Sequence, residues 1–191
     1  MKLFLIRHGE TTANLNHIYA GQSDVKLTDL GRKQAESIQP ILAPFHFDKV
    51  YSSDLSRAID TQMLALPGIV GEQTPLIREF DVGSLVGLPF SEATNLPITQ
   101  EGGRDYSTVG GENGEMVCAR VRKFLDMLEA DPHDYVAAFA HNGVILSMMQ
   151  LVLGTNYNRS AMQSKNCAIH VFEFDGTTWR LLAWNYMRNI D

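Results

Sequence analysis

The sequence lacks several features that mark particular classes of protein. It has only two cysteines in 191 residues, Cys118 and Cys167, and no CxxC spacing, which argues against a disulfide framework. No segment approaches the ~18 consecutive apolar residues of a membrane span. The apolar run at residues 3–6 is also too short for the core of a signal peptide. We therefore expect a cytoplasmic protein with two reduced thiols and no membrane partner.

Positive charge is scarce as well. There are 16 Lys and Arg against 22 Asp and Glu, which gives a net charge of −6. Nucleic acids and anionic membranes select basic surfaces, so we expect no nucleic-acid partner. An anion site in such a chain must instead concentrate a few arginines in one place. No HxH, HExxH or ExxH spacing occurs, so we expect no metal and no cofactor.

Apolar strands alternate with amphipathic helices along the chain. Short apolar runs predict buried strands at residues 3–6, 49–52 and 135–140. Helical spacing predicts a helix capped by Thr28 and ended near Pro40 and Pro44, and further helices at 55–66, 115–129 and 144–153. Residues 168–174 and 179–185 predict an antiparallel hairpin. This alternation predicts an α/β fold, a three-layer sandwich with a mostly parallel central sheet, helices on both faces and an antiparallel C-terminal hairpin.

The length and the local composition suggest one domain with one irregular segment. We expect a single domain over residues 1–191. Residues 75–114 hold seven glycines and three of the seven prolines and show little periodicity. Long irregular segments of this kind often cover a functional site. We call residues 75–114 the excursion.

Charged residues follow three of the predicted strands. Arg7 and His8 come directly after the first strand, Arg57 lies just after the second, and His141 ends the third. In open α/β sheets, ligands bind outside the carboxyl ends of the strands. Three separate regions of the sequence therefore bring two arginines and two histidines to one edge of the sheet.

These residue types suit phosphoryl chemistry. The arginine fork binds phosphate with parallel hydrogen bonds. A neutral histidine can attack phosphorus when a hydrogen bond fixes its tautomer, and arginines can stabilise the charge that develops. An acid must protonate the leaving oxygen, and Glu79 or Asp81 in REFDVG can supply it. Taken singly, each residue has an ordinary structural interpretation, which we keep for four histidines without a pairing motif: His17, His46, His133 and His170.

A set of motifs in fixed order goes further than any one residue. LIRHGET, GQSDVKLTDLGRKQA, YSSDLSRAIDT, PLIREFDVGSLVGL, GGENGEMVCARVRKFL and FAHNGVI span residues 3 to about 147. Together they resemble the motifs of the histidine phosphatase superfamily, the phosphoglycerate mutase-like proteins, in its small bacterial-type phosphatase branch.

The resemblance implies a role for each matching position. His8 would be the phosphorylated nucleophile, and Glu79 the residue that protonates the leaving group and later activates water. The catalytic set would be His8, Glu79 and His141. The phosphate would be bound by Arg7, Asn14, Arg57, His141 and Asn142, and the substrate rim would include Gly21, Gln22 and Arg104. The family needs no metal.

Three departures from the family pattern fall on the rim of the pocket. Leu85-Val86-Gly87 stands where phosphatases commonly carry Trp-Glu-Gly, Lys26 where many carry proline, and Asn142 where glycine is usual. The resemblance implies a phosphomonoesterase acting on a small phosphorylated metabolite through a phosphohistidine. The alternatives are a cofactor-dependent phosphoglycerate mutase and a phospho-ligand binding module without catalysis. Sugar phosphates, phosphoglycerates and nucleotide-like phosphates all remain open as substrates, and so does the oligomeric state.

Overall fold

The strands of the described residues form one six-stranded sheet. The computed structural model describes residues 1–93, 95–98, 103–154 and 162–187. The strand order is β3-β2-β4-β1-β5-β6. The strands are β1 (Lys2–Arg7), β2 (Lys49–Ser53), β3 (Glu72–Thr74), β4 (Tyr135–Ala140), β5 (Ile169–Phe174) and β6 (Trp179–Tyr186). Strands β1 to β4 pair in parallel, while β5 runs antiparallel to both β1 and β6. The predicted α/β sheet with its antiparallel C-terminal pair is confirmed.

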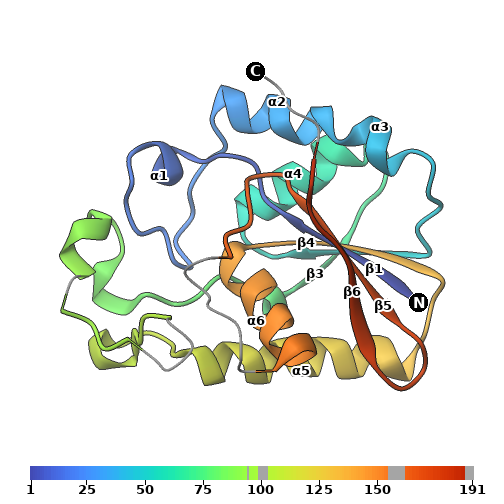
Figure 1. Ribbon diagram of the computed structural model, residues 1–191. Coiled ribbons are helices and arrows are strands. Elements are labelled where there is room, and N and C mark those ends of the chain that lie inside the picture. Colours follow the sequence, from blue (N-terminus) through green and yellow to red (C-terminus); the bar gives the residue numbers. More distant parts are fainter. Residues whose placement is uncertain (94, 99–102, 155–161, 188–191) are drawn as a thin grey trace.

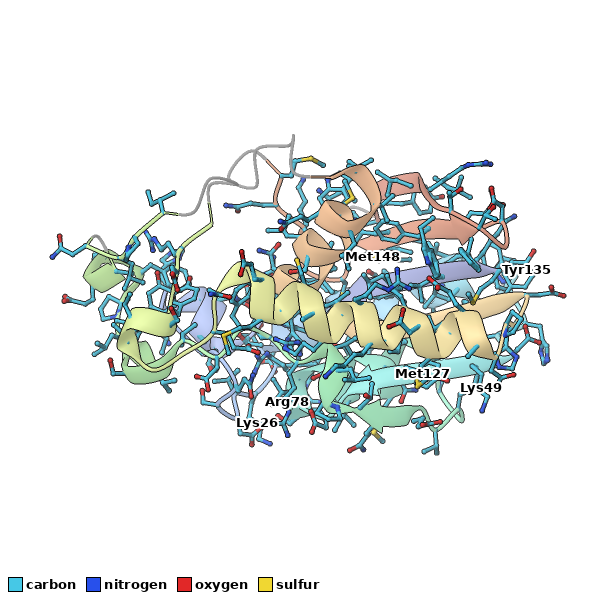
Figure 2. All side chains as sticks on the ribbon, turned by 90° about the horizontal axis from the view of Figure 1, so that it is seen from below. Lys26, Lys49, Arg78, Met127, Tyr135 and Met148 are labelled. Atoms are coloured by element: carbon cyan, nitrogen blue, oxygen red, sulfur yellow. The ribbon has the colours of Figure 1, made fainter. Side chains whose placement is uncertain are left out.

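Alternating side chains of β1 divide the core into two layers. Leu3 and Leu5 belong to the apolar cluster formed with α5 (Gly114–Ala130) and α6 (Asn142–Leu153). Phe4 and Ile6 belong to the opposite cluster, with α2 (Asp29–Ser37), α3 (Gln39–Leu42) and α4 (Ser56–Ala65). Figure 1 shows these two groups of helices on opposite sides of the sheet, and Figure 2 shows α5 lying beside α6 on one face of the sheet. A central strand covered on both faces explains the continuous apolar run at residues 3–6.

The helix ends follow the capping chemistry of the sequence. The hydroxyl of Thr28 accepts a hydrogen bond from the Gly31 N–H at 3.0 Å, so Thr28 caps α2 as predicted. The predicted break near Pro40 is also present. The helix is interrupted at Ile38, and Pro40 lies in the first turn of α3, where a missing N–H costs nothing.

Two short elements escape the pattern analysis. Strand β3 has only three residues, EQT, and no apolar alternation, and it forms because it pairs in parallel with β2. Helix α1 (Thr12–Leu15) is a single turn closed by a capping box between Thr11 and Asn14. Elements of three or four residues carry too little periodicity to predict.

The excursion is ordered to a larger extent than its composition suggests. Its described residues form four 3₁₀ turns, at Pro75–Ile77, Gly83–Leu85, Phe90–Ala93 and Ser107–Val109. A small apolar cluster that includes Tyr19, Val82 and Leu85 supports it. The Tyr19 N–H donates to the Leu88 carbonyl at 2.9 Å, which ties the excursion to the loop after α1. The excursion extends from the sheet on the same side as α1 (Figure 1).

Two further expectations bear on the class of protein. Cys118 and Cys167 are not joined in a disulfide. None of the helices in the described ranges has both the length and the hydropathy needed to cross a bilayer.

Candidate active site

A pocket of about 700 Å³ opens at the carboxyl ends of β1 and β4. It brings together eight of the ten residues that the sequence analysis selected: Arg7, His8, Asn14, Gly21, Arg57, Glu79, Arg104 and Asn142. The other two, Gln22 and His141, do not line the pocket but are hydrogen-bonded to residues that do, Glu79 and Arg57 respectively. The prediction that separate strand ends converge on one edge of the sheet therefore agrees with the structure.

His8 is buried and held in a defined tautomer. Its Nδ1 lies 2.7 Å from the Gly9 carbonyl oxygen, so Nδ1 carries the proton and donates, and the Nε2 lone pair is available to a ligand. Burial, followed by the charges of Arg57 and Arg7, lowers the pKa of His8 well below its ordinary value. The side chain is consequently a neutral imidazole, the form that can act as a nucleophile.

The glycine after His8 is required by close backbone packing. A Cβ on Gly9 would lie 2.4 Å from the carbonyl oxygen of Gly31, and a Cβ on Gly31 would lie 2.0 Å from the carbonyl oxygen of Glu10. The loop after β1 and the start of α2 therefore approach each other as only two glycines allow. This contact links the RHG motif to the later LTDLG motif and fixes where His8 stands.

Arg57, which lines the pocket, forms a buried pair with His141. The Arg57 side chain is 1% exposed and donates to the carbonyls of Gly21 at 2.7 Å and Ser23 at 3.0 Å. Its Nε–H donates to Nδ1 of His141 at 3.3 Å. Burial lowers the pKa of Arg57 to about 10, which leaves it a cation at neutral pH.

The bond from Arg57 also fixes the tautomer of His141. Because Nδ1 accepts, the proton of the neutral ring lies on Nε2, and this buried atom has no hydrogen-bond partner in the described residues. Burial, followed by the charge of Arg57, lowers the pKa of His141 well below its ordinary value. The rings of His8 and His141 are 5.1 Å apart between centroids. The Nε2–H of His141 is therefore a donor without a partner in the described residues, on a ring that lies close to His8.

Arg7 is held by a chain of buried polar groups from the C-terminal strands. Its guanidinium donates to the Ser164 carbonyl, and its buried Nε has no partner in the described ranges. The Asn185 N–H donates to Nδ1 of His170 at 3.3 Å, so Nε2 of His170 carries the proton and donates to the Ser164 hydroxyl at 2.8 Å. His170, interpreted from the sequence as structural, thus supports the residue that positions Arg7.

Glu79 lies at the N-terminus of α6. Its Oε1 accepts from the N–H groups of Phe80 at 2.9 Å and Gly143 at 3.0 Å. A Cβ on Gly143 would lie 2.2 Å from that oxygen, so only glycine allows the carboxylate to approach. Asp81, the other candidate acid, instead accepts from the N–H of Gly83 at 2.9 Å within its own turn and does not line the pocket. The geometry therefore favours Glu79 over Asp81.

Gln22 lies beside Glu79. Its side-chain amide donates to the Glu79 carbonyl oxygen at 3.1 Å, and Gln22 is not among the residues that line the pocket. Its place on the substrate rim stays a prediction. Its neighbour Gly21 does line the pocket and accepts from Arg57.

An ion pair that the sequence analysis missed holds the start of the excursion at Arg78 and Glu79. Arg120 donates to Glu112 at 2.9 Å, and each side chain is 15% exposed. The same guanidinium donates to the carbonyls of Arg78 at 2.6 Å and Glu79 at 3.0 Å. Burial raises the pKa of Glu112, but hydrogen bonds from Arg120 and the Asp81 N–H outweigh it and lower the pKa overall. The motif GGENGEMVCARVRKFL contains both residues and was the available signal.

The two asparagines differ in how they face the pocket. Oδ1 of Asn14 accepts from the Thr11 N–H at 3.1 Å and from Asn166 at 3.4 Å, which leaves its NH₂ group as the donor on the pocket side. Oδ1 of Asn142 accepts from the Ser164 N–H at 3.1 Å. Asn142 begins α6, so its position at the pocket places the N-terminal end of that helix beside the ligand.

Comparisons with known proteins match nearly the whole chain to the family that its motifs resemble. The profile of the histidine phosphatase superfamily (branch 1) matches residues 3–187. The 2,3-bisphosphoglycerate-dependent phosphoglycerate mutase of Cytophaga hutchinsonii is 33% identical over 160 residues, which are 77% of this chain and 75% of that protein. The adenosylcobalamin/alpha-ribazole phosphatase of Escherichia coli is 28% identical over 165 residues, 81% of this chain and 80% of that protein. The structure of mycobacterial glucosyl-3-phosphoglycerate phosphatase in complex with VO3 aligns with a TM-score of 0.83 at 28% identity, over 96% of this chain and 98% of that one.

Proposed function

Because this chain belongs to the histidine phosphatase superfamily, we propose that it hydrolyses a small phosphorylated metabolite through a phosphoryl group carried on His8. One observation carries the proposal. The hydrogen bond from Nδ1 of His8 to the Gly9 carbonyl, 2.7 Å long, leaves the Nε2 lone pair available in a pocket that Arg7 and Arg57 line. This is the arrangement that nucleophilic attack on a phosphate ester needs.

In the first step, the phosphoryl group moves from the substrate to His8. Nε2 forms the bond to phosphorus while the bond from phosphorus to the substrate oxygen breaks. Negative charge on the phosphoryl oxygens is stabilised by Arg7, Arg57 and the Nε2–H of His141. The protonated carboxyl group of Glu79 gives its proton to the leaving oxygen, which departs as an alcohol.

In the second step, water removes the phosphoryl group. The Glu79 carboxylate takes a proton from a water molecule as its oxygen attacks phosphorus and the bond to Nε2 breaks. Inorganic phosphate leaves, His8 returns to its neutral form, and Glu79 is again protonated. The acid of the first step thus serves as the base of the second, so the cycle closes without a further group.

We propose that the reaction needs no metal ion. The pocket already places two arginine cations beside His8. These cations supply the positive charge that a divalent metal would otherwise contribute, and they repel a metal ion.

A phosphoglycerate mutase is the second candidate, and the relative that is 33% identical favours it. A mutase must retain a doubly anionic intermediate beside the phosphohistidine and exclude water. Beyond the phosphate-binding residues, the lining of this pocket is largely apolar, and Arg104 is its one further cationic side chain in the described ranges. This wall supports hydrolysis over transfer. The complete set of His8, Glu79, Arg57 and His141 also argues against a binding module without catalysis.

The experiment is hydrolysis of 4-nitrophenyl phosphate in excess EDTA. We expect turnover by the wild type, loss of turnover in His8→Ala, and wild-type rates in the exposed-histidine control His46→Ala. Turnover that persists in His8→Ala would refute the assignment of His8 as the nucleophile. Interconversion of 2- and 3-phosphoglycerate that is faster than phosphate release would replace hydrolysis with the mutase reaction.

A further inference from the structure

Part of the wall of the active-site pocket is aromatic. Tyr19 contacts Phe90 edge to face at a centroid distance of 4.9 Å and Tyr106 at 5.9 Å, and Tyr106 contacts Phe80 at 5.9 Å. All four rings line the pocket, together with aliphatic side chains such as Ile18. A wall of this composition binds apolar or aromatic ligand surface and disfavours a strongly hydrated one.

The size of the pocket also favours a large ligand over a small one. Its volume of about 700 Å³ is far larger than a phosphate ion needs. Pockets of roughly 300–1,000 Å³ take drug-sized ligands. A three-carbon phosphate would leave most of the aromatic wall in water, whereas a ring system would cover it.

One charged residue stands on this wall, apart from the phosphate-binding group. Arg104 lies in the excursion, and its guanidinium donates to the hydroxyl of Tyr19. Arg7 and Arg57 come instead from β1 and α4 and stand beside His8. Arg104 forms no ion pair with an acidic side chain in the described ranges. In a chain with a net charge of −6, a cation that lines a pocket without an acidic partner suits an anionic group of a ligand.

Building on the proposed function, we propose that the natural substrate is a bulky phosphomonoester whose alcohol portion carries an apolar ring system and, beyond it, an anionic group. The phosphate binds at Arg7, Arg57 and His141, the ring lies against Phe90 and its aromatic neighbours, and the anionic group binds Arg104. Specificity then resides in the excursion, while the chemistry resides at the sheet edge.

The test of the anionic group compares a carboxylate with its neutral isostere. Values of kcat/KM are measured for 4-carboxyphenyl and 4-carbamoylphenyl phosphate and for the corresponding 6-substituted 2-naphthyl phosphates, so that two lengths are covered. The variants are Arg104→Gln and, as a matched control, Arg32→Gln at an exposed arginine of α2. We expect the wild type to prefer the carboxylate by about tenfold on at least one scaffold, as a hydrogen bond to a charged group implies. Arg104→Gln abolishes that preference, and Arg32→Gln keeps it.

The test of the ring uses Phe90, which is 41% exposed and so tolerates truncation. Phe90→Ala should lower kcat/KM for the naphthyl esters by about tenfold more than for glycerol 2-phosphate, because only the naphthyl ring loses an aromatic contact. Leu88→Ala, also 41% exposed in the same segment but outside the pocket lining, is the control and should change neither.

The outcomes separate the two proposals. Equal carboxylate preference in wild type and Arg104→Gln on both scaffolds, or equal losses on naphthyl esters and glycerol 2-phosphate in Phe90→Ala, would overturn this substrate class and leave phosphatase activity intact. The absence of hydrolysis of every ester by the folded wild type would instead refute the proposed function itself.

Discussion

The contact between Gly143 and Glu79 gives the sharpest prediction of the structure. In Gly143→Ala, the new Cβ would lie 2.2 Å from Oε1 of Glu79 and 2.3 Å from Cδ2 of Phe80. Ordinary carbon–oxygen contacts begin near 3.4 Å, so the carboxylate must shift by about 1 Å to relieve the overlap. The methyl group therefore displaces the proposed acid without changing its chemistry.

The expected loss follows from that displacement. Misplacing a reacting group by about 1 Å costs roughly 100-fold in rate. The loss should appear in kcat/KM for alkyl phosphates, whose leaving oxygen needs the proton. It should be much smaller for 4-nitrophenyl phosphate, because nitrophenolate leaves without protonation. The fold should survive, since overpacking costs about 1–3 kcal/mol and alanine in a helix returns about 1 kcal/mol relative to glycine.

A double-mutant cycle assigns the effect to Glu79. Values of kcat/KM for glycerol 2-phosphate are measured in wild type, Gly143→Ala, Glu79→Gln and the double variant, with urea unfolding as the check on stability. If the alanine acts through the acid, it costs little once the acid is gone. An equal loss in both backgrounds, or no loss in Gly143→Ala alone, would refute the assignment of Glu79 as the acid.

Three further predictions concern the buried charges. Burial lowers the pKa values of His8, His141 and His170, so below pH about 6.5 the unfolded chain binds up to three more protons than the folded one, and the free energy of unfolding should fall as the pH drops. Urea unfolding at a series of pH values checks this fall, and a free energy of unfolding that does not change with pH below about 6.5 would contradict it. Arg57→Met should lower kcat/KM by about 100-fold, and Arg57→Lys should restore only part, because lysine lacks the second donor; full activity with lysine would contradict the paired geometry. Arg120→Met should destabilise the protein by about 3 kcal/mol in urea unfolding, because its carboxylate partner stays buried without a counter-charge; a loss under about 0.5 kcal/mol would show that this ion pair does not support the fold.

The sequence predicts the sheet edge well because its signals there are local. The strands before Arg7 and His141 are continuous apolar runs, and parallel topology then brings their ends together. Glu79 lies outside any helix or strand periodicity, and only the set of motifs in family order predicts its role. The structure brings these residues to one pocket or, for His141, into a hydrogen bond with a residue that lines it.

What the sequence does not predict depends on contacts between distant segments. Nothing near residue 164 indicates that its carbonyl accepts from Arg7, and Arg120 looks like an ordinary helix-surface residue until the carbonyls of residues 76, 78 and 79 are seen around it. The hydrogen bond from the Gln22 amide to the Glu79 carbonyl is of the same kind, since it joins residues that are 57 positions apart in the chain. Such residues are defined by what packs against them and not by their own pattern.

The central claim is that His8 carries the phosphoryl group, and trapping the phosphoenzyme tests it most directly. Glu79→Gln should still form the intermediate from 4-nitrophenyl phosphate, whose leaving group needs no acid, but should release it slowly because no base activates water. We expect a burst of nitrophenolate equal to the concentration of active sites, and mass spectrometry of the quenched protein should find one phosphoryl group on the peptide that contains His8. A folded variant that shows neither burst nor label, or that carries the label on another residue, would contradict the account.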